Sequence, residues 1–332
     1  MNDGPLDANT INALVADATA APSQHNAQPW AFRRLRGMDV LRLYADPERA
    51  LPHTDPENRG LLMGCGAALF NLRVSAAAAG LTPDVRLLPD PASATFLAEV
   101  SLTRTGPRDS SLARLAPSIR RRHSSRLPFR DEEIPAAAKE RLSEAARVEG
   151  ADLFFPDPWH VRSIVELVRD AEDTEALDPG VHEETVRWTH PEPSPVTGAA
   201  DGVPAGAFGP RQHGTSVPVR DFAVGRPVPG RGWAVFEKNP HIALLGTAGD
   251  KPLDWLRAGQ ALERVLLQAT ADGLVASLTS QPLEWPDIRW AVRDPLSAMA
   301  NVQMVIRLGY GPEGEASPRR PVADVLDVTD VT

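Results

Sequence analysis

Cysteine is nearly absent from this sequence, since Cys65 is the only one among 332 residues. A single cysteine can form neither an intramolecular disulfide nor a cysteine-based zinc site. The N-terminus has no basic segment followed by an apolar run, and no stretch approaches the ~20 apolar residues of a membrane helix. These absences predict a soluble cytoplasmic protein with no membrane partner.

A concentrated basic face is also missing from the sequence. The formal net charge is −9 at pH 7, and no dense block of Lys and Arg occurs. Nucleic acid is therefore not an expected partner, because its phosphates need such a face for neutralisation. Hydrophobic residues make up 42% and charged residues 24% of the chain, which is ordinary for a globular protein. A folded protein with a small-molecule ligand is the expectation.

The familiar catalytic and nucleotide-binding motifs are incomplete. Residues 309–314 spell GxGxxG after a predicted strand, but Pro312 prevents the helix that this fingerprint requires. His182 opens a His-Glu pair typical of metalloprotease helices, but Val186 stands where the second histidine ligand should be. No GxSxG or Walker sequence occurs. We therefore assign no metal ligand and no catalytic side chain.

Hydrophobic periodicity predicts helices and strands in alternation, which indicates an α+β fold. The segment 56–79 is apolar nearly all round, so this helix is expected to be buried. Helices are predicted over 10–20, 56–79, from 111, over 135–148, 158–177, 179–188 and 252–273, and from 286. Strands are predicted over 30–35, 40–44, 81–88 and 95–103, up to 155, and over 274–278 and 302–308.

The segment 190–232 is rich in Pro and Gly and has little periodicity. Structureless segments of this length are uncommon within compact domains and are either functional or mobile. We interpret it as a lid inserted into the fold, and the term lid segment is used below for residues 190–232.

The segment 21–30, APSQHNAQPW, gathers hydroxyl and amide side chains on a loop bounded by prolines. Such a loop offers converging hydrogen bonds to a planar ligand rich in heteroatoms, with little entropy lost on binding. The same residues also suit an Asx-type turn at a helix end, with Trp30 in the core. Residue types alone leave both interpretations open.

The segment 121–129, RRHSSRLPF, is a compact basic cluster. The ordinary interpretation of such a cluster is a solvated turn on the surface. Guanidinium groups, however, pair bidentately with phosphate, and a cation beside a flavin stabilises the reduced anionic ring. An anion-binding role is therefore the functional alternative.

The two segments together resemble the signatures of the nitroreductase family. APSxxNxQPW over 21–30 is similar to the family's flavin loop, and RxSxR over 122–126 is similar to the element that opens its subunits. The resemblance implies a nitroreductase-like α+β fold that binds FMN, with Gln28 and Trp30 in structural roles. It implies these flavin contacts: Pro22, Ser23, Gln24, Asn26, Arg122, Ser124 and Arg126.

Two later segments resemble further parts of the family's flavin site. Residues 302–311 and 318–322 are similar to the closing strand and basic tail, which implies phosphate contacts from Arg319 and Arg320. Ordinary surface charges would explain these two arginines equally well. Residues 274–281 correspond to the strand and turn beside flavin N5. Weaker candidates there are Thr279, Ser280 and Gln281.

The order of the two signatures differs from that of ordinary family members. The RxSxR element normally precedes the loop, but here it follows the loop by about 100 residues, and neither signature has a second copy. We infer two unequal tandem halves that form an intramolecular pseudo-dimer with one FMN per chain. Residues 1–108 supply the loop, and residues 109–332 supply the RxSxR element and the lid segment. Such a fusion predicts a monomer.

The arrangement is most similar to the Acg subfamily of fused nitroreductase-like proteins. The resemblance implies an FMN-binding oxidoreductase with ping-pong hydride transfer from NAD(P)H to an electron-poor acceptor, a nitroaromatic or quinone-like molecule. If the lid segment covers the flavin, the alternative is an FMN-sequestering protein with little or no NAD(P)H turnover. The resemblance does not choose between the two.

Overall fold

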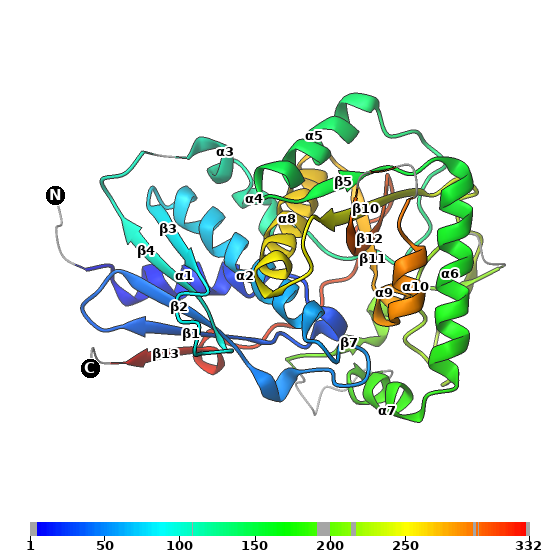
Figure 1. Cartoon of the computed structure of the whole chain (residues 1–332), viewed down its shortest axis with the longest axis horizontal. Coiled ribbons are helices and arrows are strands. Elements are labelled where there is room, and N and C mark those ends of the chain that lie inside the picture. The colour runs from blue at the N-terminus through cyan, green and yellow to red at the C-terminus, as the bar shows by residue number, and fades with distance from the viewer. Residues whose placement is uncertain are drawn as a thin grey trace.

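The computed structural model describes residues 5–107, 109–190, 200–213, 217–294, 297 and 299–329. Two long helices, α2 (Arg59–Ala78) and α8 (Pro252–Ala271), lie at the centre of the molecule, with one β-sheet on each side of the pair (Figure 1). This arrangement confirms the predicted α+β fold.

The first unit begins with a helix that starts at Ala8, two residues before the predicted position 10. Asp7 caps α1 by accepting a hydrogen bond from the amide of Thr10, and Ile11 and Leu14 lie on the buried face of the helix. The elements of this unit are α1 (Ala8–Ala18), β1 (Trp30–Leu35), β2 (Val40–Ala45), α2, β3 (Thr82–Leu87) and β4 (Phe96–Thr103).

The second unit repeats this series of elements. Its elements are α5 (Ala136–Val148), β5 (Asp152–Phe154), β10 (His241–Thr247), α8, β11 (Val275–Thr279) and β12 (Asn301–Gly309). Strand β10 is absent from the sequence-based prediction. It is a run of apolar residues that are almost all buried, so it lacks the alternation that marks a strand with one solvated face.

The two units share one topology. The strand order is β1-β2-β4-β3 in the first sheet and β5-β10-β12-β11 in the second. Along the chain, the central helix follows the second strand of its unit, so α2 connects β2 to β3 and α8 connects β10 to β11. A glycine with positive φ follows each central helix by two residues, Gly80 (+76°) and Gly273 (+78°). Glycine ends a helix readily in this conformation. The repeat confirms the two tandem halves of unequal length.

Helices α2 and α8 approach each other closely where they cross, because each has a glycine at the contact, Gly66 and Gly259. A Cβ atom on Gly66 would lie less than 3.0 Å from the carbonyl oxygen of Leu256, and one on Gly259 less than 3.0 Å from that of Met63. Each glycine stands seven residues after the first residue of its helix, 59 to 66 and 252 to 259. Gly66 and Gly259 therefore allow the close packing of the two helices.

By length and composition α2 could cross a membrane, contrary to the expectation that no such stretch exists. However, 89% of its apolar window is buried inside the protein. The helix is therefore a core helix, as its all-round apolar surface predicted.

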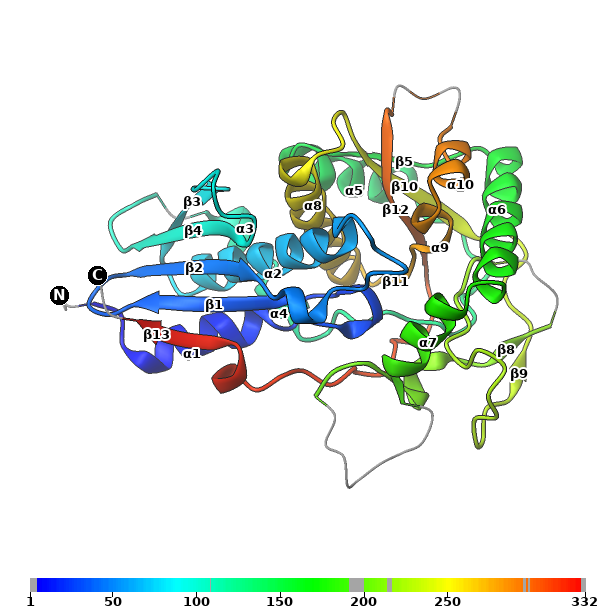
Figure 2. The ribbon, with the colours of Figure 1, turned by 60° about the horizontal axis from the view of Figure 1, so that its bottom comes forward.

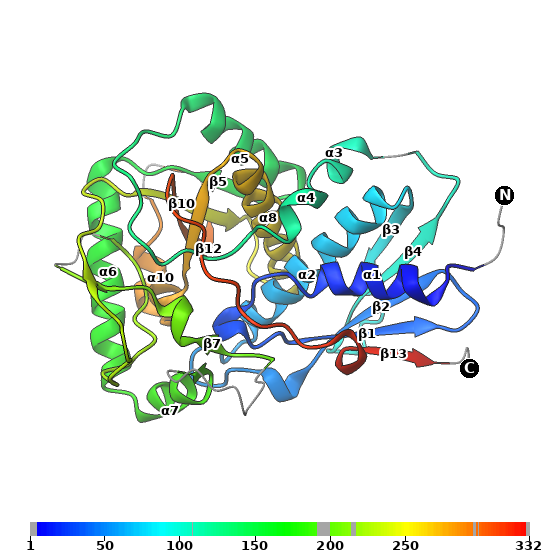
Figure 3. The same cartoon turned by 180° about the vertical axis from the view of Figure 1, so that it is seen from behind.

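The C-terminal strand returns to the first unit. Strand β13 (Leu326–Thr329) pairs in parallel with β1, so the first sheet has the order β13-β1-β2-β4-β3. Figure 3 shows the connection from β12 running across the molecule to this sheet. The sequence analysis did not predict β13, and a division at residue 108 places this strand in the other half. The boundary at 108 stays a prediction.

A long excursion separates β5 from β10, whereas a short hairpin joins β1 to β2 (Figure 2). Within the lid segment, residues 191–199 and 214–216 lie outside the described residues. The excursion contains the helices α6 (Pro158–Ala176) and α7 (Pro179–Arg187), followed by the 3₁₀ turn η3 (Ala205–Phe208). Its paired short strands are β6 (Thr189–His190) with β7 (Val203–Pro204), and β8 (Arg211–Gln212) with β9 (Trp233–Ala234).

The remaining helices are short. The helix predicted from residue 111 is interrupted and forms two pieces, α3 and α4. Their bounds are α3 (Ser110–Ala113), α4 (Ala116–Ile119), α9 (Gln281–Glu284) and α10 (Pro286–Ala291), with 3₁₀ turns at η1 (Gln24–Asn26), η2 (Pro47–Arg49) and η4 (Val322–Asp324).

Candidate functional site

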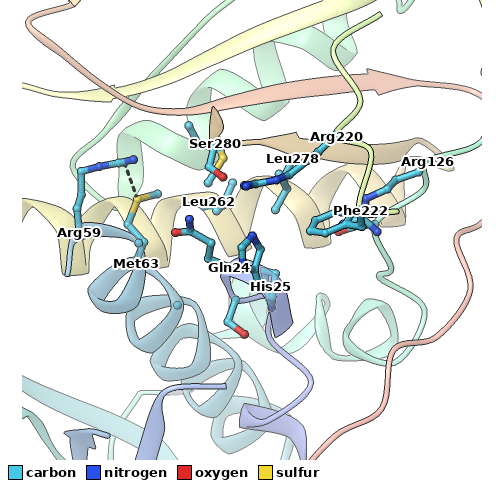
Figure 4. A pocket seen from close by; sticks show the side chains of 16 residues that line it. Gln24, His25, Arg59, Met63, Arg126, Arg220, Phe222, Leu262, Leu278 and Ser280 are labelled. Atoms are coloured by element: carbon cyan, nitrogen blue, oxygen red, sulfur yellow. Dashed lines mark hydrogen bonds between the residues drawn. The ribbon is translucent and has the colours of Figure 1, made fainter. Parts of the chain in front are cut away.

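A pocket lies where the two units meet, with an empty volume of about 740 Å³ that includes the space at its mouth. This is within the usual size of small-molecule sites. In Figure 4, Gln24 and His25 lie between Met63 on one side and Phe222 and Arg126 on the other. The pocket is lined by Pro22, Ser23, Gln24, His25, Arg59, Gly60, Met63, Gly64, Ser124, Arg126, Arg220, Phe222, Leu262, Leu278, Ser280 and Met304.

The loop between α1 and β1 has a strained backbone. His25, Asn26 and Gln28 have φ values of 51°, 55° and 54°, a region that residues other than glycine rarely occupy. Ser23 holds this conformation, because its carbonyl oxygen accepts from the amide of Asn26 at 3.0 Å and its Oγ accepts from the amide of Gln28 at 2.9 Å. Strain of this kind clusters at ligand sites.

Small residues on α2 let the loop approach the helix closely. A Cβ atom on Gly60 would lie less than 3.0 Å from Oε1 of Gln24, and one on Gly64 would lie 3.3 Å from the Cβ of Ser23. Side chains at these two positions would fill the space beside the loop. The two glycines therefore shape one wall of the pocket.

The RxSxR element runs beside β11. The amide of Ser125 donates to the carbonyl oxygen of Ala276 at 2.8 Å, and this contact turns Ser124 and Arg126 toward the pocket. Arg126 donates to the carbonyl oxygen of Ala207 at 2.8 Å. Both side chains therefore line the pocket, and their contact with FMN stays a prediction.

The lid segment contributes two side chains that the sequence analysis missed, Arg220 and Phe222. Arg220 forms ion pairs with Glu284 at 2.9 Å and Glu175 at 3.2 Å. The ring of Phe222 lies under the guanidinium of Arg126, 4.5 Å from its carbon atom. No local pattern in the sequence marks these residues, because the segment has no periodicity.

The charges that face the pocket are positive. None of the residues that line it in the described part of the chain is Asp or Glu, whereas Arg59, Arg126 and Arg220 all line it. Burial and the charge of Arg220 lower the pKa of Arg126 to about 10, and burial with the charge of Arg289 does the same for Arg59. The pocket therefore favours an anionic ligand.

Six of the predicted flavin contacts do not line the pocket. Thr279 donates to the carbonyl oxygen of Pro218 at 2.7 Å, and Gln281 donates to Glu175 at 2.9 Å, so both face the excursion. Their side chains hold the lid segment and α6. The residues outside the lining are Asn26, Arg122, Thr279, Gln281, Arg319 and Arg320.

Asn26 connects the loop to the lid segment and to the C-terminal tail. Its Nδ2 donates to the carbonyl oxygen of Gly202 at 2.9 Å, and its Oδ1 accepts from Arg319 at 2.9 Å. The amide of Arg320 donates to Oε1 of Gln28 at 2.9 Å. Asn26 and the two tail arginines therefore fix the shape of the loop.

Arg122, Arg319 and Glu263 form a buried charged cluster next to the loop. The nearest nitrogen of Arg122 lies 3.4 Å from a carboxylate oxygen of Glu263, and both side chains are buried. Burial raises the pKa of Glu263 to about 7, and burial with the charge of Arg122 lowers that of Arg319 to about 9. Both arginines also donate to the carbonyl oxygen of Ala20. Their proposed contact with a phosphate stays a prediction.

The structure adds several lining residues that lie on predicted helices and strands. They are mostly apolar and carry no chemical signature, so periodicity marks them only as core. They are Met63 on α2, Leu262 on α8, Leu278 on β11 and Met304 on β12.

Comparison with known proteins identifies the family. No family model matches the chain. The protein named “Putative NAD(P)H nitroreductase Rv3131” of Mycobacterium tuberculosis is 30% identical over 332 residues, which cover 98% of this chain and 94% of that one. The chain belongs to the nitroreductase family. “Putative NAD(P)H nitroreductase acg” of the same organism is 29% identical over 339 residues, 99% of this chain and 98% of the relative. The predicted resemblance to the Acg-like nitroreductases is therefore confirmed.

Solved nitroreductase structures resemble the chain more weakly. A structure titled “putative nitroreductase” from Anabaena variabilis aligns with 92% of this chain and 88% of its own, at 11% identity and a TM-score of 0.46. The FMN-dependent nitroreductase NfnB of Mycobacterium smegmatis, solved with NADPH, aligns with 64% of this chain and 97% of its own, at 16% identity and a TM-score of 0.39. Membership of the nitroreductase family is carried by the sequence relatives.

Proposed function

We propose that the pocket binds FMN and that the protein is an FMN-dependent oxidoreductase of the nitroreductase type. The observation that carries this proposal is the buried guanidinium of Arg126 in a pocket whose described lining residues include no Asp or Glu. Arg126 forms no ion pair with any described acidic side chain, and its pKa is lowered by burial and by another cation. A buried cation without a counter-ion is costly, so an anionic ligand is expected beside it.

The donor set of the pocket fits FMN. Ser23, Gln24 and Ser124 offer hydroxyl and amide groups, and Leu262, Leu278 and Met304 offer an apolar surface for a planar ring. This combination of apolar walls and a few polar groups is typical of cofactor sites. FMN carries a phosphate and a ring that becomes anionic on reduction, which matches the positive charge of the lining.

Bound FMN would supply hydride transfer between NAD(P)H and an electron-poor acceptor, such as a nitroaromatic or a quinone. The residues of the protein itself would hold the ligand, provide positive charge beside it and exclude water. Arg126 and Arg220 lower the energy of negative charge in the pocket, and Phe222 covers it from the lid side. No titrating side chain is needed for hydride transfer itself.

A second function, FMN sequestration without turnover, is favoured by the position of the lid segment. Arg220 and Phe222 line the pocket, and Arg220 is tied to Glu284 and Glu175 by ion pairs. A reductant must displace these side chains if it enters from this side. The lid therefore supports storage as the alternative to catalysis.

One site per chain and a monomeric state follow from the unequal halves. The loop between α1 and β1 spans residues 19–29, whereas only Glu149, Gly150 and Ala151 separate α5 from β5 in the second unit. The second unit therefore has no counterpart of the ligand loop. The pseudo-dimer already brings the loop to the RxSxR element within one chain, so no second subunit is needed.

An absorbance spectrum of the purified protein, recorded anaerobically before and after NADPH, tests the proposal. We expect oxidised-flavin bands, about one FMN released per chain, and bleaching by NADPH. A spectrum that only dithionite bleaches would favour sequestration. Protein that stays colourless and takes up no added FMN would refute flavin binding.

A further inference from the structure

His25 is a buried polar side chain with no hydrogen-bond partner. Only 4% of the residue is exposed, and neither Nδ1 nor Nε2 has a partner in the described part of the chain. The other polar side chains of the loop are satisfied, since Gln24 donates to Glu284 and Asn26 donates to Gly202. His25 therefore stands apart from its neighbours.

The surroundings of the imidazole offer it nothing to bind. The ring of Phe222 meets it edge to face at 5.6 Å, and its charged neighbours are the guanidinium groups of Arg126 and Arg220. Guanidinium groups have no acceptor atom, and an aromatic ring cannot replace a conventional partner. A buried donor and acceptor without partners are costly, which points to a partner supplied by a ligand.

The backbone directs this side chain into the pocket. His25 has φ 51° and ψ 17°, a left-handed conformation inside the 3₁₀ turn η1. The turn is closed by the hydrogen bond from the amide of Ala27 to the carbonyl oxygen of Gln24 at 3.0 Å. Strain of this kind persists only where the surrounding structure holds it. In Figure 4 the ring stands between Gln24 and Phe222, within the pocket.

The electrostatic setting keeps the imidazole neutral. Burial, followed by the charges of Arg220 and Arg126, holds the pKa of His25 well below its usual value. A neutral imidazole has one N–H donor and one acceptor nitrogen. The two nitrogens point away from each other, so only one of them can meet a given ligand edge, either its N–H with a C=O group or its bare nitrogen with an N–H group, and the edge of a cyclic imide presents both kinds of group.

We propose that His25 is a ligand-contacting specificity residue whose neutral imidazole hydrogen-bonds such an edge. This inference rests on the proposed function, because the flavin pyrimidine ring carries an edge of this kind. A polar group on the electron acceptor is the other source of the same chemistry. In either case His25 positions the ligand and does not transfer a proton at neutral pH.

The test compares two variants that tolerate positive φ, so that backbone strain does not confuse the result. Asn and Gly both occupy the left-handed region readily. His25→Asn keeps a donor and an acceptor, whereas His25→Gly removes both. We expect His25→Gly to raise the Kd for FMN by roughly 10-fold and His25→Asn by less than about threefold, since one net hydrogen bond is worth about this much. Thermal melts check that all three proteins are folded.

Imidazole ¹⁵N NMR of the full chain supplies a readout that a merely structural residue would not change. The chain has eight histidines, and the signals lost in His25→Asn assign those of His25. We expect these signals to shift when FMN is added to the apoprotein. If the signals shift only when 4-nitrobenzoate is added to the FMN-loaded protein, His25 contacts the electron acceptor and not FMN. His25→Gly would then weaken the binding of 4-nitrobenzoate instead of the binding of FMN.

The two proposals can fail separately. If the wild-type chain binds FMN but the His25 signals move with neither ligand and His25→Gly binds both ligands normally, the role of His25 is refuted and the flavin site stands. If the wild-type chain binds no FMN, both proposals are refuted.

Discussion

At the scale of single residues, the proposed site depends on Arg126, a buried cation that forms no ion pair with any described acidic side chain. We expect Arg126→Ala to weaken FMN binding by roughly 10- to 100-fold, the usual cost of losing a hydrogen bond to a charged group. Arg126→Lys keeps the charge but loses the planar fork, so its effect should be intermediate. The measurement is the Kd from quenching of flavin fluorescence.

Arg121→Ala is the matched control for this prediction. Arg121 lies in the same basic cluster, but its side chain is 55% exposed and pairs with an exposed carboxylate of Glu313 at 3.2 Å. Exposed ion pairs contribute little, so FMN binding should be unchanged. Equal losses in Arg121→Ala and Arg126→Ala would contradict a specific role for Arg126.

The sequence predicted the polar part of the pocket better than the rest of it. Ser23, Gln24, Ser124 and Arg126 were found because their residue types and spacing resemble family signatures, and all four line the pocket. Arg122 belongs to the same signature but faces Glu263. A sequence motif indicates which residues lie together along the chain. It does not show that an acidic residue far away in the sequence, here Glu263, will pair with one of them.

At the scale of elements, the lid segment is fastened by a carboxyl group shared among three parts of the chain. Oε1 of Glu284 accepts from Gln24 at 2.9 Å, from Ser280 at 2.7 Å and from Arg220 at 2.9 Å. Oε2 has no partner among the described residues. Burial raises the pKa of Glu284 to about 8, despite the opposing charge of Arg220. Burial therefore favours the protonated form of Glu284, although this form gives up the charge of its ion pair with Arg220.

This pKa predicts a pH dependence of stability. A carboxyl group whose pKa is raised by folding contributes stability that is complete below the unfolded pKa and is lost as the pH rises through the folded pKa. Between pH 5 and 8 the Tm of the wild type should therefore fall. Burial also raises the pKa of Glu172 and Glu263 to about 7, so they act in the same direction.

Glu284→Gln resembles the protonated carboxyl group and should flatten this dependence. We expect its Tm to fall less than that of the wild type between pH 5.5 and 8.5, measured by circular dichroism. Parallel Tm curves would show that Glu284 does not hold its proton in this range.

At the scale of the whole molecule, the order of the two family signatures predicted two halves but not how these halves are joined. The periodicity of the segment 56–79 gave α2 nearly to its ends. It could not show that β13 returns to β1, because pairing between residues 32 and 326 leaves no local pattern. Strand β10 was missed for a related reason, since burial on both faces removes the alternation that marks a strand.

The crossing of α2 and α8 joins the two units into one core, so we expect them to unfold together. The buried core runs without interruption from Ile11 and Trp30 in the first unit to Leu256 and Ile306 in the second. Denaturation followed by circular dichroism and by tryptophan fluorescence should give a single coincident transition. Two separated transitions would show that the units are independent.

Two glycine variants sharpen this test because they lie in different units but at the same contact. A Cβ atom on Gly66 or Gly259 would press on the backbone of the other helix, at a cost of about 1–3 kcal/mol. Gly66→Ala and Gly259→Ala should therefore both move the whole transition to lower denaturant by similar amounts. Gly232→Ala is the control, since a Cβ atom there meets nothing within 4 Å. If Gly66→Ala destabilised only one phase of a two-phase curve, the contact between the central helices would not couple the unfolding of the two units. Contacts other than the helix crossing would then have to hold the two sides of the pocket together.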